Sequence, residues 1–243
     1  MASTSEVGHT KNVDNFETLI SYCTGYEALY NPSNTNITIP NLTTLFDESK
    51  ASVKLVKTTE SPFNNIEGQR KLVFKPLRPL ATKVLGALRA SGAPATVIAD
   101  AETINRKIQG KRADNTIVVP QPGETPKNKI SVSQQSFDML IDHFEKLIEL
   151  IAIELRYNPN EEPLKVANLI DYKKQLEIIN TKVKNAYTPY RNAMIARDKM
   201  LYNPETGLVA ISQLVKNYVK SVFNASSPEY KLINKLHFKT ILK

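Results

Sequence analysis

Residues 136–156 read SFDMLIDHFEKLIELIAIELR, the stretch of the chain with the clearest structural pattern. Its apolar side chains recur at steps of three and four residues, which places them on one face of an α-helix. The pattern predicts an amphipathic helix that packs this face into a core. The face consists of Phe137, Leu140, Ile141, Phe144, Ile148, Ile151 and Leu155.

Similar patterns extend along the whole chain of 243 residues, of which only eight are glycine. No alternation of apolar and polar residues is long enough for a sheet, although residues 116–119 suit one short strand. The sequence therefore predicts an all-α protein built from antiparallel helical bundles. Further helices are expected at 14–30, 40–59, 71–91, 95–109, 163–186, 188–201 and 206–223.

The tripeptide Tyr-Asn-Pro occurs three times, beginning at Tyr30, Tyr157 and Tyr202. Each copy follows one helical pattern and precedes another. Proline disfavours the helical conformation of the residue before it, and asparagine tolerates the turns that end helices. The tripeptides therefore predict helix–helix corners, with a shared ligand site as the alternative.

The two halves of the chain resemble each other in three further places. Residues 15–20 match 136–141, Asn41-Leu42 matches Asn168-Leu169, and 74–78 match 187–191. In this alignment the last two matches lie about four helical turns closer together in the second half. The pattern predicts an internal duplication with an insertion in the first copy.

The predicted duplication gives two units of about four helices each, at 14–110 and 134–224. Residues 111–133 contain three prolines and are expected to form a linker between the units. The polar residues 1–13 are predicted to be a disordered leader. The basic tail at 225–243 is predicted to form a short helix.

The sequence lacks the signals of several protein classes. A single cysteine, Cys23, excludes an internal disulfide and a cysteine-based zinc site. The glycine spacing matches no phosphate-binding loop and no nucleophile elbow, so neither a cofactor nor a small-molecule substrate is predicted. With no apolar signal at the start and no apolar run of about 18 residues, we expect a cytoplasmic protein without a membrane span.

One candidate catalytic site surrounds His143 in the helix quoted first. Asp138, Asp142, Glu145 and Glu149 form a row on that helix, and carboxylates beside a histidine can bind a metal or transfer protons. The row is equally typical of the solvated face opposite the apolar stripe. A helical metalloenzyme that uses His143, Asp142 and Glu145 is therefore one alternative function.

The formal net charge of +8 includes two basic clusters. The first ends the helix expected at 95–109, where cations also stabilise a helix C-terminus. The second places a lysine at every fourth residue of the tail, which on a helix forms one stripe. Either cluster can contact nucleic-acid phosphates. The clusters are Arg106, Lys107, Lys111 and Arg112, and Lys231, Lys235, Lys239 and Lys243.

The helical plan without a recognisable catalytic motif favours a non-enzymatic protein. We expect it to act by protein–protein interaction or self-assembly, with a partner protein or a second copy bound to its surface. Binding of nucleic acid through the two basic clusters is the first alternative.

Overall fold

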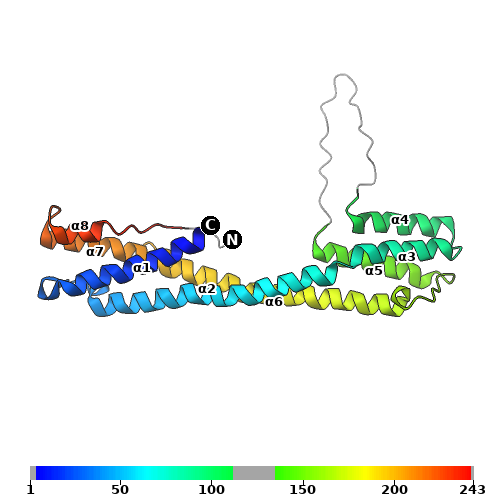
Figure 1. The fold of residues 1–243 in the computed structure, drawn as a ribbon, viewed down its shortest axis with the longest axis horizontal. Helices are drawn as coiled ribbons and strands as arrows, with labels where there is room; N and C mark the ends of the chain where they lie inside the picture. Colours follow the sequence, from blue (N-terminus) through cyan, green and yellow to red (C-terminus); the bar gives the residue numbers. More distant parts are fainter. Residues whose placement is uncertain (1–3, 112–134, 242–243) are drawn as a thin grey trace, which may run out of the picture. The chain divides into compact units, whose positions relative to one another are not determined.

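The computed structural model describes residues 4–111 and 135–241 (Figure 1). These residues form eight α-helices, three short 3-10 helices and no strand, which confirms the predicted all-α class. The predicted strand at 116–119 and all of the predicted linker except Lys111 lie outside the described residues. The α-helices are α1 (Thr4–Gly25), α2 (Ile39–Phe74), α3 (Leu77–Ala90), α4 (Ala95–Gln109), α5 (Phe137–Ile153), α6 (Val166–Tyr202), α7 (Leu208–Phe223) and α8 (Pro228–Asn234), and the 3-10 helices are η1 (Glu27–Leu29), η2 (Thr35–Ile37) and η3 (Glu162–Leu164).

The chain divides into two compact units that differ from the two consecutive units predicted. The terminal unit comprises Met1–Phe63 and Ala186–Lys243, and the central unit comprises Asn64–Asn185. The predicted boundaries group α1–α4 and α5–α7, with α8 in the predicted tail, and do not follow the compact units. The reason is that α2 and α6 are longer than predicted, so each half contributes helices to both units.

Helix α6 continues through Pro189, where the sequence predicted a break. An interior proline costs about 3 kcal/mol because it removes one helical hydrogen bond. Within the terminal unit, the rings of Tyr187 and Tyr190 lie 5.4 and 5.5 Å from the ring of Phe63, and such aromatic contacts offset part of that cost. The predicted match of 187–191 to 74–78 is therefore wrong, because Pro189 begins no helix.

The insertion inferred from that match is also wrong. Helices α2 and α6 have nearly equal lengths of 36 and 37 residues. Each contains one proline, Pro62 in α2 and Pro189 in α6.

Helix α5 begins close to where it was predicted because Ser136 caps it. The Ser136 hydroxyl accepts a hydrogen bond from the Met139 N–H at 3.2 Å, which satisfies one of the free donors of the first turn. Phe144 is fully buried, as the stripe predicted. Leu155 is instead 96% exposed, because the helix ends at Ile153.

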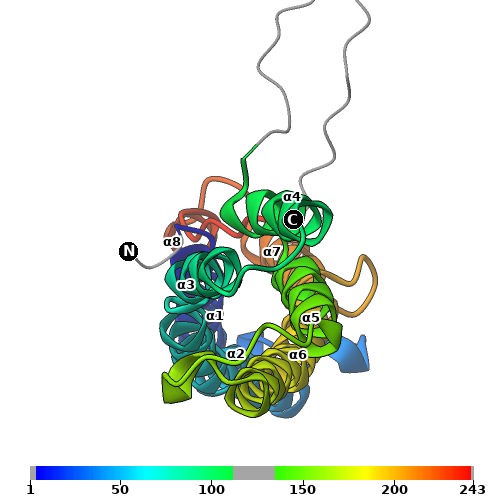
Figure 2. The ribbon, with the colours of Figure 1, turned by 90° about the vertical axis from the view of Figure 1, so that its right-hand side faces the viewer.

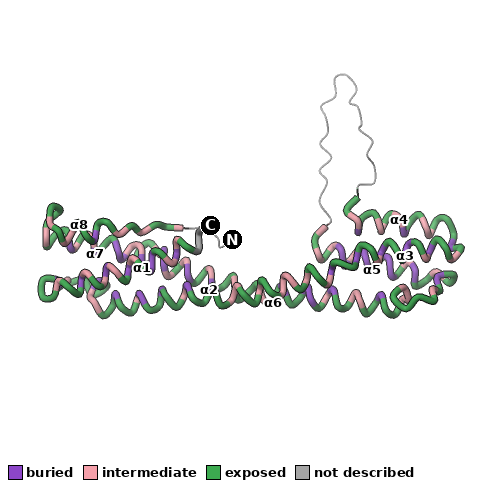
Figure 3. The backbone as a smooth tube through the Cα atoms, viewed as in Figure 1, coloured by how far each residue is buried: buried purple, intermediate pink, exposed green. Residues whose placement is uncertain are grey.

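Each unit has its own apolar core (Figure 3). In the central unit α3, α4 and α5 contact one another (Figure 2), and the core includes Leu77, Leu88, Ile108, Phe144, Leu147, Leu169 and Leu176. In the terminal unit α1, α7 and α8 contact one another, and the core includes Phe16, Leu19, Leu42, Leu201, Leu208, Val215 and Ile233.

The prediction of a disordered leader is wrong for residues 4–13. Helix α1 begins at Thr4, and His9, Asn12 and Val13 are buried in the terminal unit. The His9 ring lies against the ring of Tyr202, with 2.5 Å between His9 Nδ1 and the tyrosine hydroxyl. Polar residues therefore order this segment through contacts that a hydropathy pattern does not reveal.

The tail contains the predicted short helix, α8, but not the predicted lysine stripe. Helix α8 ends at Asn234, and the chain then continues without helical structure to residue 241. Asn12 holds this segment by donating to the Lys239 carbonyl at 2.7 Å and accepting from the Lys239 N–H at 3.0 Å. Lys239 thus lies beyond the helix, and Lys243 lies outside the described residues.

Two of the Tyr-Asn-Pro segments form the same hydrogen bonds at their corners. The Tyr30 hydroxyl donates to the Ile37 carbonyl at 2.6 Å, and the Tyr157 hydroxyl donates to the Leu164 carbonyl at 2.8 Å, each seven residues later. The first corner joins α1 to α2 and the second joins α5 to α6. Buried tyrosine hydroxyls thus satisfy backbone carbonyls of η2 and η3.

Candidate interaction groove

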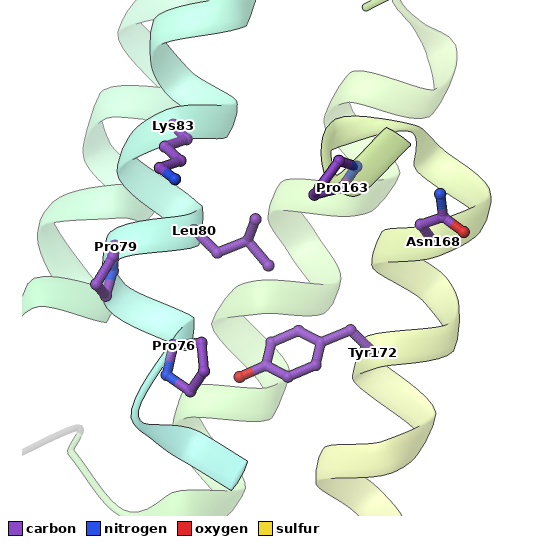
Figure 4. Close-up of a pocket in the computed structure, with 7 residues that line it drawn as sticks. All are labelled: Pro76, Pro79, Leu80, Lys83, Pro163, Asn168 and Tyr172. Carbon is purple, nitrogen blue, oxygen red and sulfur yellow. The ribbon is translucent and has the colours of Figure 1, made fainter. Parts of the chain in front are cut away.

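The central unit has two hollows that follow one face of α3, and we call them together the α3 groove. The first has a volume of about 440 Å³. Its walls come from α3, from η3 and from the start of α6 (Figure 4). The lining residues are Pro76, Pro79, Leu80, Lys83, Pro163, Asn168 and Tyr172.

The second hollow has a volume of about 540 Å³ and shares Lys83 with the first. Its α3 side is formed by the small residues Gly86, Ala87 and Ala90. A Cβ atom added at Gly86 would meet no atom within 4 Å. The opposite side is the segment around the second Tyr-Asn-Pro corner, from Arg156 to Leu164.

Hydrogen bonds hold the walls of the groove in place. Tyr172 crosses from α6 toward Pro76 (Figure 4), and its hydroxyl donates to the Val73 carbonyl at 2.7 Å. Burial raises the pKa of Tyr172 to about 12. On the other side, Arg156 Nη1 donates to the Gly92 carbonyl at 2.7 Å. These bonds connect α6 to the end of α2, and the corner to the end of α3.

The first hollow is mainly apolar, whereas the second is nearly half polar and has two cations and one carboxylate in its lining. Lys83 lies between the two hollows, and Arg156 and Glu161 line the second. Apolar concave surfaces with a few charged groups are typical of binding sites for ligands and peptides. The arrangement can bind an apolar side chain beside an acidic one.

The two carboxylates proposed to act with His143, Asp142 and Glu145, each pair with a lysine. Asp142 lies 2.8 Å from Lys146, and this hydrogen bond holds its pKa below the usual range. Glu145 pairs with Lys173. In the part of the chain that the structure describes, no group of three His, Cys, Asp or Glu side chains could hold a metal ion.

His143 itself points into the core of the central unit. It is 3% exposed, and burial lowers its pKa. Its Nδ1 lies 3.7 Å from the Asp142 carboxylate, and its Nε2 has no hydrogen-bond partner among the described residues. The geometry gives the metalloenzyme hypothesis no support.

The two basic clusters belong to different units. Arg106 donates within α4 to the Thr103 hydroxyl at 2.9 Å. Gly110 caps the end of α4 with a left-handed φ of 70°, which suits glycine. Lys231 lies in the last turn of α8 and Lys235 directly after it. Arg112 and Lys243 lie outside the described residues. Nucleic-acid binding stays a prediction for both clusters.

Sequence reasoning missed the α3 groove entirely. Pro76 belongs to the matched segment 74–78, and Pro79, Gly86 and Ala87 lie within the helix expected at 71–91, so no pattern distinguishes them as a site. The one available signal was the comparison of the two halves of the chain. An alignment of α3 with α7 would have shown small residues where the second half has larger ones.

No described helix has both the length and the apolar composition needed to cross a membrane. Comparison of the chain with protein-family models, with curated proteins and with solved structures found no match in any of the three.

Proposed function

We propose that this protein is a non-enzymatic binding protein whose α3 groove receives a segment of a partner protein. The observation that carries the proposal is that the two hollows follow each other along one helix face and share Lys83. From Pro76 to Ala90 this face extends about 20 Å. That length suits three to four turns of a bound helix, or a shorter extended segment.

The lining also supports a protein ligand. Small residues at Gly86, Ala87 and Ala90 let a bound backbone approach α3 closely, and the charges of Lys83 and Arg156 can orient it. The wall residues are held by hydrogen bonds before anything binds, so little ordering entropy opposes association.

A photo-crosslinking experiment in the source cells tests the proposal. Benzoyl-phenylalanine replaces Pro79, an exposed residue of the groove, and in a matched control it replaces Ala99, an exposed residue of α4 outside it. We expect a covalent adduct at position 79 and none at position 99. No adduct at 79, or equal adducts at both positions, would overturn the proposal. An adduct with a second copy of the chain would assign the groove to self-assembly instead.

We also infer that the chain arose by internal duplication of a four-helix unit, with α1–α4 matching α5–α8. The repeated corner supports this inference: Asn41 donates to the Thr35 carbonyl at 2.7 Å, and Asn168 donates to the Glu162 carbonyl at 2.5 Å, each six residues back. The contact of α7 with η2 also has its counterpart in the contact of α3 with η3. Function then resides in what differs between the halves.

A further inference from the structure

Helices α3 and α7 bury their residues in the same register. Each has four buried positions with identical spacing, so one helix can be aligned on the other without gaps. The pairs are Leu77 and Leu208, Ala81 and Ser212, Val84 and Val215, and Leu88 and Val219. In this alignment Ala87 of the central unit corresponds to Tyr218 of the terminal unit.

Tyr218 covers the first Tyr-Asn-Pro corner of the terminal unit. Its ring meets the ring of Tyr30 edge-on, with centroids 5.3 Å apart. Its hydroxyl accepts a hydrogen bond from the Asn31 N–H at 3.1 Å. In the terminal unit a tyrosine on α7, the helix aligned with α3, therefore fills the space beside this corner.

The corresponding space in the central unit is the second hollow of the groove. Ala87 and the residue after the corner tyrosine, Asn158, both line it. At position 87 an alanine lines the hollow, where the aligned position of the other unit carries the Tyr218 ring. Helix α3 therefore supplies no aromatic ring beside this corner, and a hollow of about 540 Å³ lies there instead.

We propose that the hollow beside Ala87 binds a tyrosine side chain of the partner, next to an acidic residue that pairs with Lys83 and Arg156. The inference rests on the function proposed above and names the chemistry of the bound segment. Two cations against the single carboxylate of Glu161 make the lining complementary to an acidic neighbour. The tyrosine ring supplies the apolar area, and its hydroxyl stays near the polar rim.

The experiment uses the full chain and p-cresol, the side chain of tyrosine, as the probe in an amide NMR titration. We expect saturable shifts at Gly86, Ala87 and Asn158, with a dissociation constant on the order of 1 mM for so small a ligand. Ala87→Tyr should abolish these shifts, since it places a tyrosine ring in the hollow, as Tyr218 does beside the corner of the terminal unit. The matched control Ala99→Tyr adds the same side chain on α4 and should leave them unchanged.

A second variant tests the same idea in the other unit and does not depend on the folding of Ala87→Tyr. Tyr218→Ala should open an equivalent hollow, so that p-cresol produces a new set of shifts at Tyr30 and Asn31. If p-cresol produces no shifts at Gly86, Ala87 and Asn158 of the unaltered chain, the inference is overturned. Shifts there that survive Ala87→Tyr would overturn it as well.

Two charged probes test the acidic neighbour. We expect 3-(4-hydroxyphenyl)propionate to bind several-fold more tightly than tyramine, and Lys83→Glu to reverse that order. Equal affinities for the two probes would show that the groove does not select an acidic neighbour and would overturn that part of the inference. A crosslinked partner at position 79 without binding of any phenol would preserve the proposed function and overturn only the aromatic anchor.

Discussion

The two units differ in the segment that covers the core, which is α4 in the central unit and α8 with the chain after it in the terminal unit. In the central unit α4 has 15 residues and covers α3 and α5 as a continuous helix. In the terminal unit α8 has only 7 residues, and an extended segment follows it. A helix satisfies its own carbonyls, whereas an extended segment against a core needs donors from its neighbours.

The terminal unit supplies those donors from α1 and α7. Lys216 donates to the Leu236 carbonyl at 2.6 Å, and Asn15 donates to the His237 carbonyl at 2.8 Å. In the alignment of α3 with α7, Lys216 corresponds to the buried Leu85 of the central unit. The comparison teaches that polar residues within an otherwise apolar face mark where a helix is replaced by extended chain.

The largest effect is expected from the two buried phenylalanines, one in each core. Phe16→Ala and Phe144→Ala should each lower the free energy of unfolding by about 3–5 kcal/mol. Both rings are fully buried, so each substitution leaves a cavity inside a core. Urea unfolding followed by circular dichroism measures the loss. A loss below about 1 kcal/mol for either variant would contradict the fully buried position of that ring.

The corner tyrosines should have smaller and similar effects. Tyr30→Phe removes the hydroxyl that donates to the Ile37 carbonyl, and Tyr157→Phe removes the hydroxyl that donates to the Leu164 carbonyl. We expect a loss of about 1–3 kcal/mol from each, because each leaves a buried or half-buried carbonyl without its partner. The same urea experiment measures both, and strongly unequal losses would argue that the two corners are not equivalent.

Lys216→Leu gives the terminal unit the residue that the central unit has at the aligned position, Leu85. Its effect should be confined to the contacts of Lys216 with the extended segment. Burial lowers the pKa of Lys216, so its loss is partly offset, and we expect about 1 kcal/mol of destabilisation. The extended segment loses its donor from α7, so amide hydrogen exchange at 236–241 should accelerate several-fold. Unchanged exchange in that segment would show that Asn12 and Asn15 hold it alone.

Reversing exposed charges should have the smallest effect. Lys231→Glu with Lys235→Glu in the tail, and Arg106→Glu with Lys107→Glu in α4, should each change stability by less than about 0.5 kcal/mol for every residue replaced. Fluorescence anisotropy with a duplex oligonucleotide in 150 mM salt tests the alternative function. Tight binding that either pair abolishes would replace the proposed function with nucleic-acid recognition.

Much of the helical structure is predictable from local patterns. Helix α4 lies at the residues predicted for it, and α5 and α7 end or begin within three residues of their predicted bounds. Such patterns report which face of a segment is buried, but not against what. The start of α1 was missed because its buried residues, His9 and Asn12, are polar.

The groove was beyond prediction for a related reason. Its two walls are distant in the sequence, and only Asn158 and Pro159 of its lining belong to a repeated tripeptide, which by itself predicts a corner and not a hollow. Ala87 lines the second hollow where the aligned position of the other unit carries Tyr218, and that difference has meaning only once both helices are placed beside their corners.

The sequence by itself determined that the chain is helical and that it turns at Tyr-Asn-Pro. These are consequences of hydrophobic period and of backbone preferences, which act over a few residues. Only the tertiary structure decided that α2 and α6 run on through Pro62 and Pro189, so that each half of the chain contributes to both units. That outcome depends on aromatic contacts such as Phe63 with Tyr190 and on which faces bury together, and these are interactions between residues far apart in the chain.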